Sequence, residues 1–279
     1  ELAKEGTFEE RGIYTGIVGA RLEKTGFMEW KHMVITPEQN TPANGYGKKA
    51  QLENSNLSLK LWAEFYECGD KEHYFFPTYE EAVNDANGKY IQIEKNTLLN
   101  TEVYKKRIRM SIEPFLLDAN ERAKNEGKKA YVHVVGAGLG VWKLSDLQGV
   151  LMTDVYSDII KERDLRHISD INFSWFPKIC TTCGLVKDGE IYQTEYNRIK
   201  IHFSLRNPSE KLIGEDSGKM LVASFAWDGN SYPGNEYWLG SEYLAASGDP
   251  AAACCSTIQE LQNPEINSNV SGKNAHLYP

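Results

Sequence analysis

Long apolar runs and a cysteine framework are both missing from this sequence. No run approaches the roughly 18 apolar residues that a membrane span needs, and the opening Glu1-Leu2-Ala3-Lys4-Glu5 is not a signal peptide. The five cysteines are an odd number, and Cys254 and Cys255 are adjacent, which is a poor disulfide framework. Reduced thiols in a cytoplasmic compartment fit better. We therefore expect a cytoplasmic protein with no membrane partner.

An excess of positive charge is also missing. Asp and Glu number 39 against 31 Lys and Arg, which gives a net charge of −8. Because phosphate backbones repel such a chain, polymeric nucleic acid is excluded as the expected partner. A single small phosphorylated ligand stays compatible with this charge, because backbone N–H groups can hold a phosphate without Lys or Arg.

The common cofactor and catalytic motifs do not occur. There is no GxGxxG, no GxxxxGK[ST], no HExxH and no GxSxG. Cys180-Thr-Thr-Cys183 is a lone CxxC without the second pair that a zinc site usually needs, so it is interpreted as a turn at a strand end. His133 is interpreted as a core residue. We expect no metal and no cofactor.

What is present is a core-forming α/β pattern. The 279 residues are 41% hydrophobic, with many aromatics, and suit one large domain. Apolar spacing predicts a helix over 101–126, with a kink or restart at Pro114. A strand buried on both faces follows at 130–135, then a glycine loop, a helix over 145–163 and a strand at 171–176. This order is typical of a parallel sheet, whose ligands lie beyond the carboxyl ends of the strands.

The remaining segments give weaker signals. Residues 11–36 predict strand, turn, strand, and 37–60 have a loop composition. The other elements that we expect are a helix at 79–86, capped by Thr78 with Glu81 three residues on, and strands at 91–93, 190–194, 198–204 and 220–226. A helix beginning near Ser247 or Asp249 is also predicted, with Pro250 at its first position.

Three loops carry polar or glycine-rich signatures. Gly136-Ala-Gly-Leu-Gly-Val-Trp142 follows a buried strand and precedes a helix, which suits close approach of an anion; a tight strand-to-helix turn is the equally weighted alternative. In 16–30, Phe27 and Trp30 are either base-stacking aromatics or core residues.

The third loop follows the strand at 220–226. It holds Asp228, Asn230, Asn235 and Glu236, with Asp249 further on. Such acids could orient water or shuttle a proton in glycoside cleavage. The alternative is that Asp249 only caps a helix and Glu236 is a solvated loop acid.

Together these loops resemble the macrodomain family, especially its poly(ADP-ribose) glycohydrolase branch and the MavL-type ADP-ribosylhydrolases. The segments that carry the resemblance are Gly19-Ala-Arg-Leu-Glu-Lys-Thr-Gly-Phe-Met-Glu-Trp30, Val134-Val-Gly-Ala-Gly-Leu-Gly-Val-Trp-Lys143 and Phe225-Ala-Trp-Asp-Gly-Asn-Ser-Tyr-Pro-Gly-Asn235. Two features depart from the branch: the ribose-side loop comes last in the chain, and its Gly-Gly-Gly and Glu-Glu are absent. The first departure is what circular permutation would produce.

The resemblance implies an α/β fold with a macrodomain-like mixed central sheet flanked by helices, circularly permuted, as a single domain over 1–279 with an unassigned insertion at about 37–100. It implies Asp228, Glu236 and Asp249 as the catalytic acids. The ligand-binding residues that it implies are Phe27, Gly136, Gly138, Leu139, Gly140, Val141, Trp142, Asn230, Ser231, Gly234 and Asn235.

The implied activity is removal of ADP-ribose from a modified protein, with arginine as the linked residue and ubiquitin as a candidate carrier. The expected partner is thus ADP-ribose or an ADP-ribosylated protein, and the chain is expected to be a monomer that acts in the cytoplasm, or in a host cytosol if it is a secreted effector. A module that reads ADP-ribose without cleaving it is the main alternative. A scaffold whose loops are only turns is the third.

Overall fold

The computed structural model describes residues 6–22, 25–26, 29–53, 56–70 and 72–226. Its centre is a six-stranded sheet with the order β1-β11-β5-β6-β10-β9. The strands are β1 (Gly12–Ile17), β11 (Met220–Ala226), β5 (Ala130–Val135), β6 (Ile168–Ser174), β10 (Arg198–Ser204) and β9 (Ile191–Gln193). Every neighbouring pair is parallel except β10 and β9, which are antiparallel. This mixed sheet confirms the predicted α/β class.

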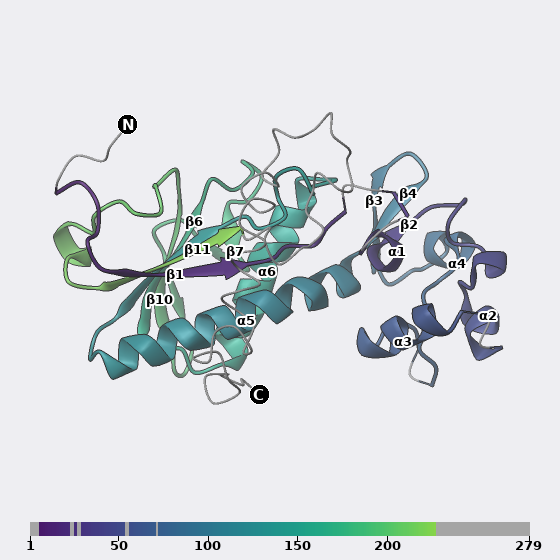
Figure 1. The fold of residues 1–279 in the computed structure, drawn as a ribbon, viewed down its shortest axis with the longest axis horizontal. Helices are drawn as coiled ribbons and strands as arrows, with labels where there is room; N and C mark the ends of the chain where they lie inside the picture. Colours follow the sequence, from purple (N-terminus) through teal and green to yellow (C-terminus); the bar gives the residue numbers. More distant parts are fainter. Residues whose placement is uncertain (1–5, 23–24, 27–28, 54–55, 71, 227–279) are drawn as a thin grey trace, which may run out of the picture.

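Two helices cover one face of the sheet, α5 (Thr101–Asn125) and α6 (Leu147–Glu162). Alternate strand residues such as Val132, Ile171 and Ile199 join the apolar sides of both helices in one core cluster. Because side chains alternate across a strand, these residues mark the helix-covered face. Figure 1 shows α5 running along the sheet as one long helix. It is continuous through Pro114, so the helix does not restart there, and the alternative that Pro114 kinks it stays a prediction.

A smaller lobe is built from residues 30–100. It contains α1 (Trp30–Met33), α2 (Lys48–Leu52), α3 (Leu57–Phe65), α4 (Tyr79–Val83), a short 3-10 helix at Pro42–Asn44, and a three-stranded antiparallel sheet of β2 (Val34–Ile35), β4 (Thr97–Asn100) and β3 (Tyr90–Glu94). Figure 1 shows this lobe beyond the end of the sheet toward which β1 points. The chain then enters α5 directly, capped by the Asn100 side chain, which accepts from Val103 N at 3.1 Å.

Most predicted elements are confirmed, and the exceptions have local causes. The strand at 130–135, the strand at 220–226 and the Thr78–Glu81 capping box of α4 occur as predicted. The loop predicted over 37–60 is wrong, because this stretch contains α2 and the first four residues of α3. Asn56, one of the residues that made it resemble a loop, caps α3 by accepting from Leu59 N at 3.2 Å. The segment 11–36 has an unpredicted helix, α1, between its strands.

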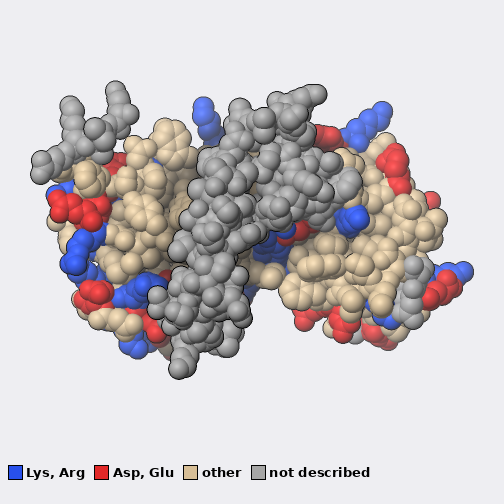
Figure 2. Space-filling model, in the orientation of Figure 1, with Lys and Arg blue, Asp and Glu red and all other residues tan. Residues whose placement is uncertain are grey.

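Smaller elements complete the described chain: β7 (Thr182–Cys183), β8 (Val186–Lys187) and a 3-10 helix at Gly214–Asp216. No helix among the described residues is long and apolar enough to cross a membrane. On the face shown in Figure 2, acidic and basic side chains are interspersed over both parts of the molecule.

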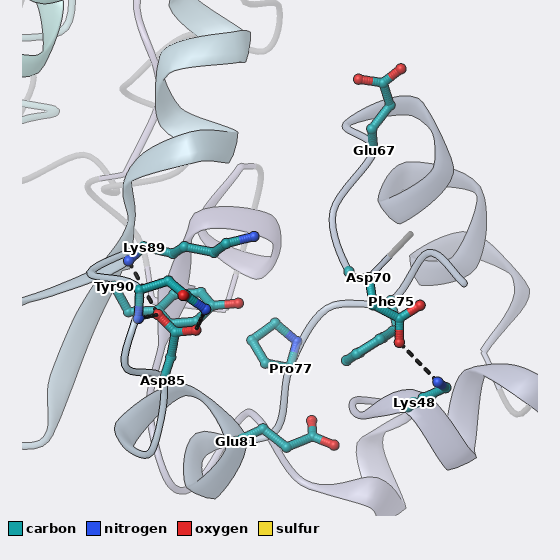
Figure 3. A pocket seen from close by; sticks show the side chains of 11 residues that line it. Lys48, Glu67, Asp70, Phe75, Pro77, Glu81, Asp85, Lys89 and Tyr90 are labelled. Carbon is teal, nitrogen blue, oxygen red and sulfur yellow. Dashed lines mark hydrogen bonds and ion pairs between the residues drawn. The ribbon is translucent and has the colours of Figure 1, made fainter. Parts of the chain in front are cut away.

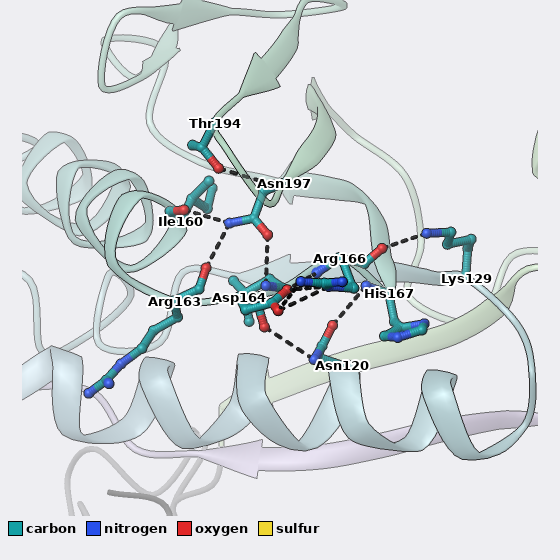
Figure 4. A network of polar contacts seen from close by, with 10 residues as sticks. Asn120, Lys129, Ile160, Arg163, Asp164, Arg166, His167, Thr194 and Asn197 are labelled. Atoms are coloured by element: carbon teal, nitrogen blue, oxygen red, sulfur yellow. Dashed lines mark hydrogen bonds and ion pairs between the residues drawn. The ribbon is translucent and has the colours of Figure 1, made fainter.

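A buried polar network ties the end of α6 to the β9–β10 turn (Figure 4). The Asn197 amide donates to the carbonyls of Ile160 at 2.6 Å and Arg163 at 2.7 Å, and its oxygen accepts from Leu165 N at 2.7 Å. Asn197 is 1% exposed, so these bonds satisfy backbone groups that water does not reach. The network fixes the chain where it leaves α6 and turns into β6.

Candidate ligand-binding site at the carboxyl edge of the sheet

The parallel strands bring three chain segments to one edge of the sheet. Strand β11 lies between β1 and β5, and all three run in the same direction. The loops that follow Ile17 and Val135 therefore flank the end of β11 at Ala226. Ligands of open α/β sheets bind outside the carboxyl ends of such strands, so this edge is the candidate site.

The loop after β5 is held by its own backbone hydrogen bonds. Ala137 N donates to Val135 O at 2.9 Å, Leu139 N to Gly136 O at 2.9 Å, and Lys143 N to Gly140 O at 3.1 Å. Because the bonds close successive turns, the loop has a defined shape without any bound ligand.

Several amides of this loop are left for a ligand. Within the described part of the chain, no acceptor lies within hydrogen-bond reach of the N–H groups of Gly138, Gly140 and Val141. Gly140 and Val141 are exposed, the latter at 52%, while Trp142 is buried. Neighbouring exposed amides of this kind can bind an anion through their N–H dipoles.

The backbone requires glycine at one position of this loop, Gly138, but not at Gly140. Gly138 has a left-handed backbone with φ +78°, which few other residues adopt. A Cβ on Gly140 would meet nothing within 4 Å, so space for an approaching ligand remains there.

The start of α6 differs from what the sequence predicts. We expect a helix N-terminus to offer free amides, but Gln148 Oε1 accepts from Leu144 N at 2.7 Å and from Ser145 N at 3.1 Å. The N–H of Leu147 is bonded as well, to Ser145 Oγ at 3.3 Å. The amides available to an anion are thus those of the glycine loop rather than those of the helix.

The loop after β1 packs directly against the glycine loop. A Cβ on Gly19 would lie 2.4 Å from the Ala137 carbonyl carbon and from Gly138 N, so two backbones touch at this point. Ala20 and Ala137 are buried at 1% and 3% exposure. The small residues of Gly19-Ala20 and Gly136-Ala137-Gly138 therefore join the two loops into one packed unit.

Trp175 is a feature of this edge that the sequence prediction missed. The predicted strand at 171–176 ends earlier, at Ser174, and Trp175 then takes a left-handed backbone with φ +61°. For a bulky residue this conformation is strained, and such strain gathers at functional sites. Its N–H donates to Ser204 O at 3.0 Å and its ring Nε1 to Arg206 O at 3.3 Å, yet the residue is 60% exposed. A bulky aromatic directly after a buried strand was the available signal.

His133 and the CxxC cysteines have structural roles. His133 is fully buried with Nε2 3.0 Å from Arg206 O, and burial lowers its pKa, so the core interpretation is confirmed. Cys180 and Cys183 are buried and unbridged. Burial raises the pKa of the Cys180 thiol to about 11 and raises that of Cys183 too, which leaves both unreactive near neutral pH. No cluster with metal-ligand composition occurs among the described residues.

A cavity of about 640 Å³ in the smaller lobe is lined by acids with structural tasks (Figure 3). Asp70 binds Lys48 Nζ at 2.8 Å and accepts from two backbone amides, which lowers its pKa to about 2. Glu81 belongs to the capping box of α4, and Asp85 accepts from Asn87 and from Lys89 N. Glu67, a further acid of the lining, pairs with Lys106, so each described carboxylate of this cavity already has a partner.

Several predicted site residues lie outside the described residues. They are Phe27, Asp228, Asn230, Ser231, Gly234, Asn235, Glu236 and Asp249. The predicted helix after Ser247 and the Cys254–Cys255 pair lie outside them as well. Of the predicted ligand-binding set, the structure describes only Gly136, Gly138, Leu139, Gly140, Val141 and Trp142, and it places all of them in one loop.

Comparisons with known proteins show which family this chain is similar to. The model of the MavL-like ADP-ribosylhydrolase family matches residues 2–278. Two proteins of Drosophila melanogaster are similar: ADP-ribosylarginine hydrolase CG3568, 37% identical over 99% of this chain and 54% of its own length, and ADP-ribosylarginine hydrolase CG2909, 35% identical over 97% and 54%. The chain thus spans about half the length of these curated relatives. With its family model matched almost from end to end, this chain belongs to the MavL-like ADP-ribosylhydrolase family.

Proposed function

We propose that this chain binds ADP-ribose at the carboxyl edge of its main sheet and hydrolyses the bond between ADP-ribose and a protein arginine. The observation that carries the proposal is the glycine loop, whose Gly138, Gly140 and Val141 amides have no acceptor among the described residues. Family membership and the names of the two fly relatives support the same ligand and the same linkage.

In this proposal the diphosphate lies on the glycine loop, and Gly136, Leu139 and Trp142 keep that loop in shape. Phe27 stacks on adenine. The residues assigned to the distal ribose are Asn230, Ser231, Gly234 and Asn235. Backbone donors suit a diphosphate in this acidic chain, because they bind it without adding Lys or Arg.

The chemistry is assigned to Asp228, Glu236 and Asp249. One carboxylate accepts a proton from water, whose oxygen forms the new bond to C1″ of the ribose. The C1″–N bond breaks, and the departing guanidine takes up a proton. Carboxylates also suit this site in two further ways: they stabilise an oxocarbenium-like centre at C1″, and they pair with a guanidinium through two hydrogen bonds.

We further propose that the domain is a circularly permuted macrodomain. Strand β11, the last strand of the described chain, lies in the sheet between β1, the first, and β5, which suits a ribose-side loop that comes late in the sequence. ADP-ribosylated ubiquitin is the first protein substrate to test, followed by other proteins modified on arginine.

Calorimetry and a turnover assay test the function together. ADP-ribose should bind saturably and more tightly than AMP, and the protein should release ADP-ribose from ADP-ribosylated arginine. Asp228→Asn should abolish turnover and keep most of the affinity. The matched control is Glu195→Gln, which changes an exposed acid in the β9–β10 turn and should alter neither turnover nor affinity.

Each contrary result has a definite meaning. Binding without turnover in the unmodified protein would make the chain a reader of ADP-ribose. Equal turnover in Asp228→Asn and the unmodified protein would remove Asp228 from the mechanism. No binding of ADP-ribose would exclude the proposed ligand.

A further inference from the structure

Two polar side chains of α5 form hydrogen bonds with the loop after β1. Ser111 Oγ donates to Val18 O at 3.0 Å, and Arg107 donates to Val18 O at 3.4 Å and to Gly19 O at 3.3 Å. The two residues are four positions apart and so share one face of the helix. A single helix face therefore fixes the two carbonyls at the point where the chain leaves β1.

The Arg107 guanidinium has a partner for every nitrogen. Its Nε donates to Glu29 Oε1, and its two terminal nitrogens serve the carbonyls of Val18 and Gly19. The other Glu29 oxygen accepts from Arg21 N at 2.7 Å. The Arg107 and Glu29 side chains are only 12% and 13% exposed. One planar fork thus holds both ends of the loop between Val18 and Glu29, a geometry that an ammonium group does not reproduce.

This network bears on the glycine loop through Gly19. The carbonyl of Gly19 accepts from Arg107, and the other side of the same residue touches the backbone of Ala137 and Gly138, where a Cβ would come within 2.4 Å. Since the contact is backbone against backbone, a shift of Gly19 moves Gly138 or opens a gap beside it. The orientation of the amides assigned to the diphosphate thus depends on a residue that lies beneath them.

We infer that Arg107 is a positioning residue, which orients the diphosphate-binding amides of the glycine loop by holding Gly19, with Ser111 in a supporting role. The inference rests on the proposed function, because it assigns those amides to the diphosphate of ADP-ribose. Arg107 itself touches no ligand in this arrangement.

The chain offers a matched control two residues away. Arg109 lies on the same helix and binds two acids, Glu113 at 2.6 Å and Glu162 at 2.5 Å, but none of its contacts reaches the loops of the site. Arg107→Lys and Arg109→Lys therefore both remove a bidentate guanidinium from α5 and keep the charge. Only the first removes a support of Gly19.

The experiment compares ADP-ribose affinity, thermal unfolding and the amide NMR spectrum in the unmodified protein and both variants. We expect Arg107→Lys to weaken ADP-ribose binding by about tenfold or more, equivalent to about 1.4 kcal/mol, because an ammonium group cannot hold Glu29 and both carbonyls in the same planar arrangement. It should also shift the Gly138 and Gly140 amide resonances in the absence of ligand.

The control, Arg109→Lys, should lower the unfolding midpoint to a similar extent and leave the ADP-ribose affinity and both resonances unchanged. Ser111→Ala, which removes a single hydrogen bond, should give a smaller loss of affinity and serves if Arg107→Lys does not fold.

Two outcomes overturn the inference. Unchanged affinity and unchanged Gly138 and Gly140 resonances in Arg107→Lys would show that Gly19 holds its place without the arginine. Equal losses of affinity in both variants would show a general effect on stability. If the unmodified protein does not bind ADP-ribose, the proposed function fails first, and the resonances alone then report whether Arg107 orients the loop.

Discussion

The polar groups at the two ends of helix α6 have opposite arrangements. At its carboxyl end, Asn197 joins the carbonyls of Ile160 and Arg163 to the amide of Leu165, and every bond is closed within the protein. Before its amino end, the glycine loop leaves the Gly138, Gly140 and Val141 amides without an acceptor among the described residues. Both clusters hold the chain at a strand-helix junction, but only the second has hydrogen-bonding capacity left over.

Solvent access explains why both arrangements are tolerated. A buried polar group without a partner costs free energy, so the network around Asn197, which is 1% exposed, must be complete. Exposed amides can bond to water, and a ligand can later replace that water. An unbonded group is therefore informative about binding only where it is exposed and rigidly held.

The largest effect on stability should come from removing the Asn197 side chain from its buried network. Asn197→Ala would remove the bonds of Asn197 to the Leu165 amide and to the Ile160 and Arg163 carbonyls, at roughly 1–3 kcal/mol each. We expect the free energy of unfolding to fall by roughly 3–5 kcal/mol, with unchanged ADP-ribose affinity in the molecules that stay folded. Urea unfolding and calorimetry measure the two quantities. Asn197→Asp, which keeps the acceptor for Leu165 and loses both donor bonds, should also destabilise the fold. A loss of ADP-ribose affinity in Asn197→Ala at unchanged stability would contradict the structural role of Asn197.

The next effect should come from separating the packed loops. Gly19→Ala adds a Cβ that would lie 2.4 Å from backbone atoms of Ala137 and Gly138, so the glycine loop must move away. We expect ADP-ribose affinity to fall by about tenfold or more, equivalent to about 1.4 kcal/mol, with a smaller change in stability. Gly12→Ala, at the other end of β1, is the control, because its Cβ would meet Leu221 O at 3.3 Å. Equal affinities in the two variants would show that the contact at Gly19 does not shape the binding loop.

Features that depend on residues near one another in the chain could be predicted from the sequence, whereas contacts between distant residues could not. The strands at 130–135 and 220–226 were predicted residue for residue, because a strand buried on both faces leaves a continuous apolar run. The glycine loop was predicted from its place after such a strand. The helices within 37–60 were missed, since the Asn and Thr residues that cap them also form loops.

The support beneath the site was missed for another reason. Arg107 and Ser111 lie on a helix where polar residues usually face water, and their partner Val18 is 89 and 93 residues away in the chain. No local pattern reports a contact over that separation. Only the three-dimensional arrangement of α5 under β1 distinguishes these two side chains from their solvated neighbours.

The smallest effect should come from substituting His32. Its ring carries a polar atom that is buried, unlike the amides of the glycine loop, and unbonded among the described residues, unlike the amide of Asn197. Its Nδ1 is buried and has no hydrogen-bond partner within the described chain, and its ring lies 5.5 Å from that of Phe76 and 4.9 Å from that of Trp62. Burial, with a smaller contribution from the charge of Lys31, lowers the pKa of His32 to about 4. The folded protein therefore keeps this ring neutral at a pH where an unfolded histidine, with a pKa of about 6.5, binds a proton.

The sign of the pH dependence follows from this difference. Between pH of about 6.5 and about 4 the unfolded state holds a proton that the folded state lacks, so the free energy of unfolding falls as the pH falls. His32→Phe preserves an aromatic ring without a titrating nitrogen and should flatten this decline in urea unfolding at pH 7.5, 6 and 5, chosen as rough steps across that window. His73→Gln, in the same lobe, should leave the decline in place. ADP-ribose affinity should be equal in all three proteins, because an unbonded atom enclosed by aromatic rings has no route to a ligand. An affinity change in His32→Phe would break the distinction between exposed and buried unbonded groups, and an unchanged decline would assign the proton to another residue.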